Sequence, residues 1–315
     1  MKDRDKFDLF GQKIKASLEA QGIPPTLASF TFSEDAARAA QNGQWHGALV
    51  EVKAFIEKVC SNGLADEHKF VVDPWIRRVN VTNEMALNIA IINSQAADWY
   101  GSEDAVGAFD FLIEEQKGLF ARCNSYLDLG AHQFIWSCYY AMRSSNTSVC
   151  AFEPSTVNVI IGLFNSLINN VIEQVTVFPF AVAASDEEGS TEAGKMLVDF
   201  VKEPVRTCRL DVCAEYSFDF VKVDIEGYEF ELLGDPDFLS RIAGAKHVHL
   251  EVHLGHLIKR NVGREAVVNR MDAAGIDGEE LYSGVEMYKF LESCDPSGFY
   301  AFLIDCKRMH SRSAM

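Results

Sequence analysis

The stretch from Asp219 to Leu233, with the sequence DFVKVDIEGYEFELL, constrains the fold of this chain more than any other. Its first half is apolar on both faces, which is typical of a strand buried between two helical layers. Lys222, Asp224 and Glu226 share one face by the period of two of a strand, and ionised groups inside a sheet are costly unless they are paired or reach a cavity. We therefore expect this strand to end at a pocket.

The residues that follow predict a sharp turn and then a helix. Gly227 permits the turn, and the run from Tyr228 to Leu233 has helical spacing. Open α/β sheets bind their ligands at the carboxyl ends of their strands, which is where Asp224 and Glu226 fall. The sequence thus predicts an active site at this strand end.

From residue 125 onwards, strands alternate with helices, which predicts right-handed βαβ units and a mostly parallel α/β sheet. The other expected parallel strands are Ser125 to Leu129, Val149 to Glu153, Val175 to Ala181 and His247 to Val252. Two further segments, Tyr282 to Leu291 and Phe299 to Cys306, are expected to form a closing antiparallel pair. This pattern predicts a doubly wound α/β domain.

The composition narrows the classes of function. With 315 residues, 48% of them hydrophobic, the chain can bury one large α/β core and a smaller accessory region. A formal charge of -17 argues against nucleic acid as a partner, because proteins that bind nucleic acids normally present a basic face. Eight cysteines without a CxxC pair, and a start unlike a signal peptide, predict reduced thiols and a cytoplasmic location. No apolar run is long enough to predict a transmembrane segment.

The N-terminal region, residues 1–97, is expected to be a mainly helical accessory region. Phe7, Phe10, Ile14 and Leu18 form one apolar face, and we expect this helix to pack on its own protein rather than on a membrane surface. Short strands or loops are expected between residues 69 and 92. We expect the catalytic domain at residues 98–306, with an exposed loop at 185–194 and a frayed basic tail at 307–315. The aromatic pair Trp99 and Tyr100 predicts a packed turn.

A candidate cofactor site lies at the ends of the first two strands of the domain. Asp128, Gly130 and Ala131 lead from a strand toward a helix start, where backbone N–H groups suit a carboxylate or a phosphate. Glu153 ends the next strand, where an acid can accept hydrogen bonds from both hydroxyls of a ribose. These features indicate an adenosine-containing cofactor. The alternatives are that Gly130 serves only a tight turn and that Glu153 serves only a helix N-terminus.

The order and spacing of several motifs resemble the FkbM-type methyltransferases over roughly residues 98 to 305. The motifs are Asp128 to Ala131, Ala151 to Pro154, Asn165 and Asn169, Ala181 with Val182, Leu210 with Asp211, Val221 to Glu229, and His249 to His253. The resemblance implies a class I, Rossmann-like methyltransferase that binds S-adenosylmethionine and methylates a hydroxyl of a small molecule, a sugar or a lipid. The implied cofactor contacts are Asp128, Gly130, Ala131, His132, Glu153, Pro154, Ser155 and Ala181.

One departure from the family pattern affects the cofactor loop. Members usually read Asp-x-Gly-Ala-Asn-x-Gly, whereas this chain has His132 in place of the asparagine and Phe134 in place of the second glycine. A side chain at this position either turns away from the loop or weakens cofactor binding. We expect Phe134 to turn away, because Gly130 and the later motifs persist.

The last parallel strand supplies further candidates. His247, His249, Glu251 and His253 alternate with apolar residues and so share one face. If this strand is the neighbour of the central one, Glu251 and His253 lie beside Asp224 and Glu226, and these four are the candidate catalytic residues. Three uses remain open: His253 or Asp224 as a general base, a site for a divalent cation such as Mg²⁺, or ion pairing among these groups and Lys222.

Three classes of function therefore compete. The first is an S-adenosylmethionine-dependent O-methyltransferase, with residues 1–97 as a lid or a homodimer surface. The second is a binding or scaffold protein that kept the fold and lost turnover through Phe134. The third is a nucleotide-dependent dehydrogenase, which is disfavoured because no GxGxxG follows the first strand. The identity of the acceptor is not encoded in a recognisable motif.

Overall fold

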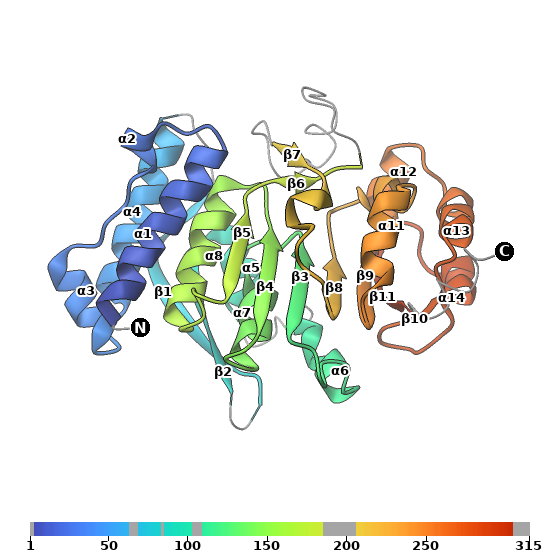
Figure 1. Cartoon of the computed structure of the whole chain (residues 1–315), viewed down its shortest axis with the longest axis horizontal. Coiled ribbons are helices and arrows are strands. Elements are labelled where there is room, and N and C mark those ends of the chain that lie inside the picture. Colours follow the sequence, from blue (N-terminus) through green and yellow to red (C-terminus); the bar gives the residue numbers. More distant parts are fainter. Residues whose placement is uncertain (1–2, 63–68, 83–84, 103–108, 185–205, 305–315) are drawn as a thin grey trace. The chain divides into compact units, whose positions relative to one another are not determined.

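The computed structural model describes residues 3–62, 69–82, 85–102, 109–184 and 206–304. The chain divides into two compact units, which are described in turn (Figure 1). Unit 1 comprises Met1–Leu112, Ala131–Phe180 and Val201–Arg206, and unit 2 comprises Ile113–Gly130, Ala181–Phe200 and Thr207–Met315. The predicted loop at 185–194 and the predicted tail at 307–315 lie outside the described residues.

Seven strands of the chain belong to one mostly parallel sheet, which confirms the predicted α/β fold class. Within unit 2 the strand order is β10-β11-β9-β8-β3, and β4 and β5 of unit 1 form a parallel pair. The parallel pairs of unit 2 are β3–β8 and β8–β9, whereas β9–β11 and β10–β11 are antiparallel. The strands are β3 (Ser125–Leu129), β4 (Ser148–Phe152), β5 (Val175–Phe178), β8 (Phe220–Val223), β9 (His247–His253), β10 (Gly278–Glu280) and β11 (Phe299–Ile304).

In unit 1, the predicted N-terminal helix packs on the protein itself. Phe10, Ile14 and Leu18 on its apolar face are completely buried, and the Phe10 and Phe164 ring centroids lie 6.1 Å apart. The Lys13 ammonium donates to the Val175 carbonyl oxygen, which ties this helix to β5. The helices of unit 1 include α1 (Asp3–Ala20), α2 (Pro25–Ala28), α3 (Glu34–Gln41), α4 (His46–Ser61), α5 (Ser94–Tyr100), α7 (Ile135–Met142) and α8 (Thr156–Ile168).

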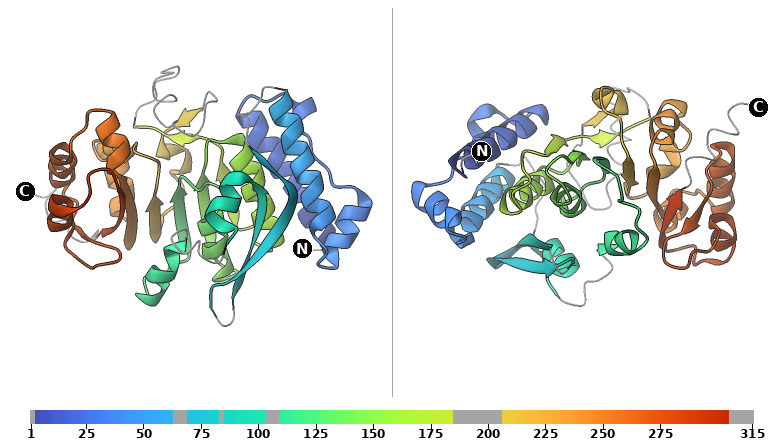
Figure 2. Two further views of the ribbon diagram at one scale, coloured as in Figure 1. Left: turned by 180° about the vertical axis from the view of Figure 1, so that it is seen from behind. Right: turned by 60° about the horizontal axis from the view of Figure 1, so that its bottom comes forward.

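The segment expected to form short strands or loops is a β-hairpin of two longer strands. Strand β1 (Phe70–Asn80) pairs antiparallel with β2 (Ala86–Asn93), and Figure 2 shows the two side by side in teal. Two family-motif asparagines of α8 hold β2. Asn169 accepts from the Asn88 N–H at 2.8 Å and donates to the Asn88 carbonyl at 2.7 Å, while Asn165 accepts from the Ala90 N–H at 2.8 Å. These side chains complete hydrogen bonds as a neighbouring strand would.

In unit 2, the prediction of one strand is wrong. Residues Tyr282 to Leu291 do not pair with the last strand; β10 does, and residues Met287–Ser293 form helix α14. Met287 and Leu291 are both completely buried, and their spacing of four residues is helical rather than strand-like. The expected strand from Val175 to Ala181 also ends early, because Ala181 and Val182 form β6, which pairs with β7 (Thr207–Cys208) in a small separate sheet.

The remaining elements of unit 2 within the described residues are helical. They are the 3₁₀ helix η2 (Leu210–Cys213) and the helices α10 (Glu229–Leu232), α11 (Pro236–Ala243), α12 (Leu254–Lys259) and α13 (Arg264–Ala273). Helix α6 (Phe111–Gln116) spans the division between the units. Strand β8 is buried along its whole length, as its two apolar faces predict, so its polar side chains need partners inside the protein.

Candidate active site

Lys222 is the buried cation of strand β8. Its residue is 3% exposed, and its ammonium lies 2.8 Å from Asp224 Oδ2 and 3.7 Å from Asp128 Oδ1 on the adjacent strand β3. Burial alone would lower the pKa of Lys222, but the carboxylates of Asp224 and Asp128 outweigh it and raise this pKa. Lys222 is therefore charged, and it holds Asp224 at the end of the strand.

The turn that follows β3 can be made only by glycine. Gly130 has a φ of +76°, and a Cβ built on it would lie 1.7 Å from the Asp224 carbonyl oxygen. This close approach brings the loop after β3 against the end of β8 within unit 2. The Lys222 ammonium reaches the Gly130 carbonyl at 3.4 Å. Gly130 is thus required for packing of the site, whatever else it contacts.

The four predicted catalytic residues lie together in unit 2, around the imidazole of His253. His253 Nε2 lies 3.4 Å from Glu226 Oε2, 3.7 Å from Asp224 Oδ1 and 3.7 Å from Glu251 Oε1. The register of β8 and β9, which pairs Lys222 with His249, produces this cluster because it places Glu251 level with Asp224.

Glu229 and His256 complete the cluster and were not among the predicted site residues. Glu229 is buried, and its Oε1 lies 3.0 Å from His253 Nδ1 and accepts from the Ile225 N–H at 3.0 Å. His256 Nδ1 lies 3.0 Å from the Glu226 carbonyl oxygen. Glu229 is the last acid of the motif from Val221 to Glu229, three residues after Glu226, and this position could have identified it as a site residue. Nothing in the sequence distinguishes His256.

Two other histidines of β9 do not join this cluster. His249 is completely buried, and its Nδ1 lies 2.8 Å from Oε1 of the equally buried Glu114. His247 lies near the Phe220 ring, with centroids 6.4 Å apart. Sharing one face of a strand therefore does not bring all four polar residues to one site.

The charges of the cluster depend on one another. Burial alone would lower the pKa of His253, but the carboxylates of Glu229, Asp224 and Glu226 raise it to about 10. Burial, and next the charge of Asp224, raise the pKa of Glu251 to about 8. The pKa of Asp224 is lowered because Lys222 and His253 outweigh its burial. At neutral pH, His253 thus carries a proton and Asp224 is the ionised carboxylate best placed to accept one.

Unit 1 holds the predicted cofactor residues from Ala131 to Ser155. Glu153 follows β4 and is 5% exposed; its Oε2 accepts from the His132 N–H and its Oε1 from the Ser155 N–H, both at 2.8 Å. The Pro154 carbonyl accepts from the Gln21 side chain at 2.7 Å, and the Ala131 N–H donates to the Phe152 carbonyl at 2.9 Å. Asp128, Gly130 and Ala181 belong to unit 2. The Glu153 carboxylate is thus fixed in orientation, with lone pairs suited to the hydroxyls of a ribose.

Phe134 turns away from the cofactor loop, as predicted. Its backbone keeps the left-handed conformation of the missing glycine, with a φ of +61°, and its side chain is completely buried. The ring lies against Gly162 of α8, where an added Cβ would be only 2.4 Å from Phe134 Cγ. The space for the ring is therefore provided by a second glycine, 28 residues further along the chain.

The other substituted residue of the loop, His132, packs in an aromatic cluster. Its Nδ1 lies 3.1 Å from the Tyr100 hydroxyl, and its ring centroid is 4.7 Å from that of Trp99. The prediction of a packed aromatic turn is only partly right: Tyr100 is buried, but both aromatic residues lie in the last turn of helix α5, and Trp99 is 39% exposed.

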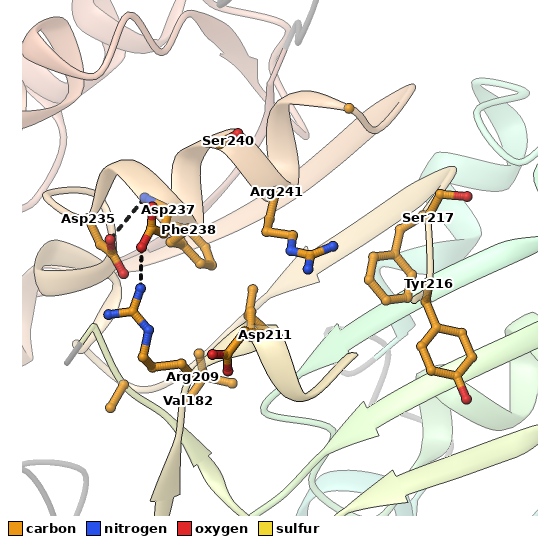
Figure 3. Close-up of a pocket in the computed structure, with 14 residues that line it drawn as sticks. Val182, Arg209, Asp211, Tyr216, Ser217, Asp235, Asp237, Phe238, Ser240 and Arg241 are labelled. Carbon is orange, nitrogen blue, oxygen red and sulfur yellow. Dashed lines mark hydrogen bonds and ion pairs between the residues drawn. The ribbon is translucent and has the colours of Figure 1, made fainter. Parts of the chain in front are cut away.

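A cavity of about 500 Å³ in unit 2 is lined by none of the predicted site residues, although three family-motif residues, Val182, Leu210 and Asp211, line it (Figure 3). It is lined by residues of β6, η2 and α11, among them Arg209, Asp211 and Arg241. Arg209 pairs with Asp237, and the Arg241 guanidinium donates to the Ala214 carbonyl at 3.2 Å. Its two arginines are thus held by groups of the protein.

Comparison with known proteins gives a family match. Residues 128–295, just over half of the chain, match the family described as "Methyltransferase FkbM domain". A comparison with curated proteins found no match. Within the described residues, no helix combines the length and apolar character needed to cross a membrane.

Several solved structures are similar to this chain. A putative O-methyltransferase from Klebsiella pneumoniae has 12% identity and a TM-score of 0.37, covering 67% of this chain and 84% of that chain. The O-methyltransferase TomG from Streptomyces achromogenes, in complex with SAM, has 13% identity and a TM-score of 0.39, covering 67% and 85%. A ribosomal protein L11 methylase from Lactobacillus delbrueckii subsp. bulgaricus has 11% identity and a TM-score of 0.39, covering 72% and 97%.

Proposed function

The chain belongs to the FkbM methyltransferase family, and from this premise we propose that it methylates a hydroxyl group of a small molecule, a sugar or a lipid. Its mostly parallel sheet is the class I fold that the resemblance predicted, and membership of the family implies use of S-adenosylmethionine. The observation that carries the proposal is the meeting of Asp224, Glu226, Glu251 and His253 at the ends of β8 and β9.

The chain's own residues fit an adenosyl cofactor. Glu153 would accept from the ribose hydroxyls, because backbone N–H groups already hold its carboxylate in place. The loop residues Gly130, Ala131 and His132 would contact the cofactor through their backbone, because the Phe134 ring is directed into the core. The further proposed contacts are Asp128, Pro154, Ser155 and Ala181. When bound, S-adenosylmethionine supplies an electrophilic methyl group on a sulfonium sulphur.

The acidic cluster would prepare the acceptor. Asp224 is ionised, its side chain is 25% exposed, and it is held by Lys222, so it can orient an acceptor hydroxyl and take its proton. Its lowered pKa makes it a weak base, which suits proton removal that accompanies methyl transfer rather than precedes it. Glu226 and Glu251 would hold neighbouring hydroxyls of the acceptor, and His253 would fix the carboxylates through its charge.

Ligand binding tests the cofactor part of the proposal. We expect calorimetric titration of the full chain to show binding of S-adenosylhomocysteine and none of NAD. Glu153→Gln should weaken S-adenosylhomocysteine binding by about 10–100-fold, because hydrogen bonds to a charged acceptor contribute roughly 1.5–3 kcal/mol. The matched control is Glu173→Gln, which alters an exposed acid outside the cofactor loop. It should leave the affinity for S-adenosylhomocysteine unchanged. Binding of NAD alone would favour a dehydrogenase.

A methyl-transfer screen tests the catalytic part. Radiolabelled S-adenosylmethionine would be offered with sugars, lipids and small hydroxylated molecules, and product formation should fall strongly in Asp224→Asn. If S-adenosylhomocysteine binds and no hydroxylated acceptor is methylated, the binding or scaffold class replaces the enzyme.

Two further proposals concern the whole chain. We propose that residues 1–97 are a mainly helical accessory region that acts as a lid or a homodimer surface; deleting them without loss of solubility, assembly or acceptor binding would refute it. We also propose a cytoplasmic location.

A further inference from the structure

We propose that Asp224, Glu226 and His253 form a site for one divalent transition-metal cation, of the kind that accepts both oxygen and nitrogen ligands, such as Mn²⁺ or Zn²⁺. One oxygen of each carboxylate and one ring nitrogen of His253 all lie within 4.8 Å of one another. Because Asp224 Oδ2 pairs with Lys222 and Oδ1 would bind the ion, the ion would replace Asp224 as the group that activates the acceptor hydroxyl. That role rests on the proposed function, whereas the existence of the site does not.

The distances around His253 Nε2 suit metal coordination better than hydrogen bonding. This nitrogen lies 3.4 Å from Glu226 Oε2 and 3.7 Å from Asp224 Oδ1, beyond the usual range of an N–H···O bond. Two ligands that lie about 2.1 Å from a metal, at angles between octahedral and tetrahedral, are roughly 3.0–3.4 Å apart. The two pairs that include His253 therefore need to close by only a few tenths of an ångström to share one ion, and the two carboxylate oxygens lie within 4.8 Å of one another.

Glu229 fixes the tautomer that metal binding requires. Its Oε1 lies 3.0 Å from His253 Nδ1, within hydrogen-bond range, and also accepts from the Ile225 N–H. Metal binding would displace the Nε2 proton of His253 into solvent. A histidine that then donates from Nδ1 to a carboxylate presents Nε2 to the metal, which is the usual arrangement behind metal-binding histidines. Glu229 is a positioning residue here, because it would act on the cation only through His253.

The His253 ring is also held in its plane before any ion binds. It stacks with the ring of His256, at 5.5 Å and 20°, and with that of Phe299, at 5.9 Å and 25°. These two contacts and the Nδ1 contact with Glu229 restrict rotation of the ring and so keep its nitrogen near Asp224 and Glu226. The arrangement thus has the rigidity of a built site rather than that of a surface cluster of acids.

The types of ligand and the exposure of the two carboxylates indicate which cation would bind and what it would do. An imidazole nitrogen with two carboxylates suits Mn²⁺ or Zn²⁺, whereas Mg²⁺ and Ca²⁺ prefer oxygen ligands alone. The side chains of Asp224 and Glu226 are 25% and 36% exposed, so water or an acceptor oxygen can reach the ion. Three protein ligands and an open position are typical of catalytic metal sites, where the ion lowers the pKa of a bound hydroxyl.

The test measures metal binding directly. Full-length protein, stripped with a chelator and dialysed, would be titrated with Mn²⁺ and separately with Zn²⁺ by calorimetry; we expect one site. Asp224→Asn and His253→Gln should weaken binding at least tenfold, and Glu229→Gln about 10–100-fold through loss of the charged partner of His253. The matched control Glu279→Gln, at an acid that pairs instead with Lys117, should bind as the wild type does.

A spectroscopic measurement on the unmodified protein tests the proposal even if the variants fail to fold. Electron spin echo spectra of the Mn²⁺ complex should show coupling to one imidazole nitrogen. Absence of that coupling, absence of Mn²⁺ and Zn²⁺ binding at millimolar concentration, or Mg²⁺ binding as tight as that of Mn²⁺ would each overturn the proposal. Metal binding without any S-adenosylhomocysteine binding would support the site while refuting the proposed function.

Discussion

Replacing Phe134 by glycine tests whether the phenylalanine side chain obstructs cofactor binding or serves only to pack the core. The ring is completely buried against Gly162, so its loss should cost about 3–5 kcal/mol, as for other large-to-small core substitutions. Glycine also relieves the left-handed backbone at this position, which returns roughly 1–2 kcal/mol. We therefore expect Phe134→Gly to lower the free energy of unfolding by about 1–4 kcal/mol.

Cofactor affinity should not change with this substitution, because the ring does not face the loop. Urea unfolding followed by circular dichroism would measure the stability of the variant, and calorimetry would measure its affinity for S-adenosylhomocysteine. A tenfold gain in affinity for Phe134→Gly would show that the phenylalanine obstructs the site, contrary to its burial.

The partner glycine supplies a sharper control through a double-mutant cycle. In the wild-type background, Gly162→Ala places a Cβ 2.4 Å from Phe134 Cγ and should destabilise the protein by about 1–3 kcal/mol. In the Phe134→Gly background the same change has room, and the helix propensity of alanine should stabilise the protein by up to about 1 kcal/mol. The reasoning fails if Gly162→Ala has the same sign in both backgrounds.

Three other predictions follow from buried polar contacts. Asn169→Ala leaves both backbone groups of Asn88 without their side-chain partner and should cost about 1–3 kcal/mol in urea unfolding, against a near-zero effect for the exposed Asn146→Ala. Lys222→Met removes the charge that balances Asp128 and Asp224 and should cost about 3–5 kcal/mol; a neutral effect would mean that these carboxylates are not ionised in the fold. The pKa of His249 is raised above its usual 6.5, because the charge of Glu114 outweighs burial. The stabilisation by this pair is therefore fully present below pH 6.5 and is lost as pH rises through the folded-state pKa. The stability difference between wild type and His249→Gln should shrink as pH rises, and a difference that grows would refute the assigned charge.

The sequence by itself determined the strand-end site. Alternation along Lys222, Asp224 and Glu226, and along Glu251 and His253, is a property of each strand's own backbone, so the shared face could be predicted locally. The order of strands and helices likewise predicted the parallel sheet. The adjacency of the two strands was only a condition of the prediction, and the pairing of β8 with β9 meets it. Periodicity failed where a short apolar run suits either a strand or a helix, as at Met287–Ser293.

Only the tertiary structure decided which side chains meet and which way they point. Alternation gives the face of a residue but not its partner, so it could not separate His249, which pairs with Glu114, from His253, which enters the acidic cluster. The direction of the Phe134 ring depends on the space left by Gly162, on another helix. Such outcomes depend on contacts between residues distant in the sequence, which form only when the core packs at close to crystalline density.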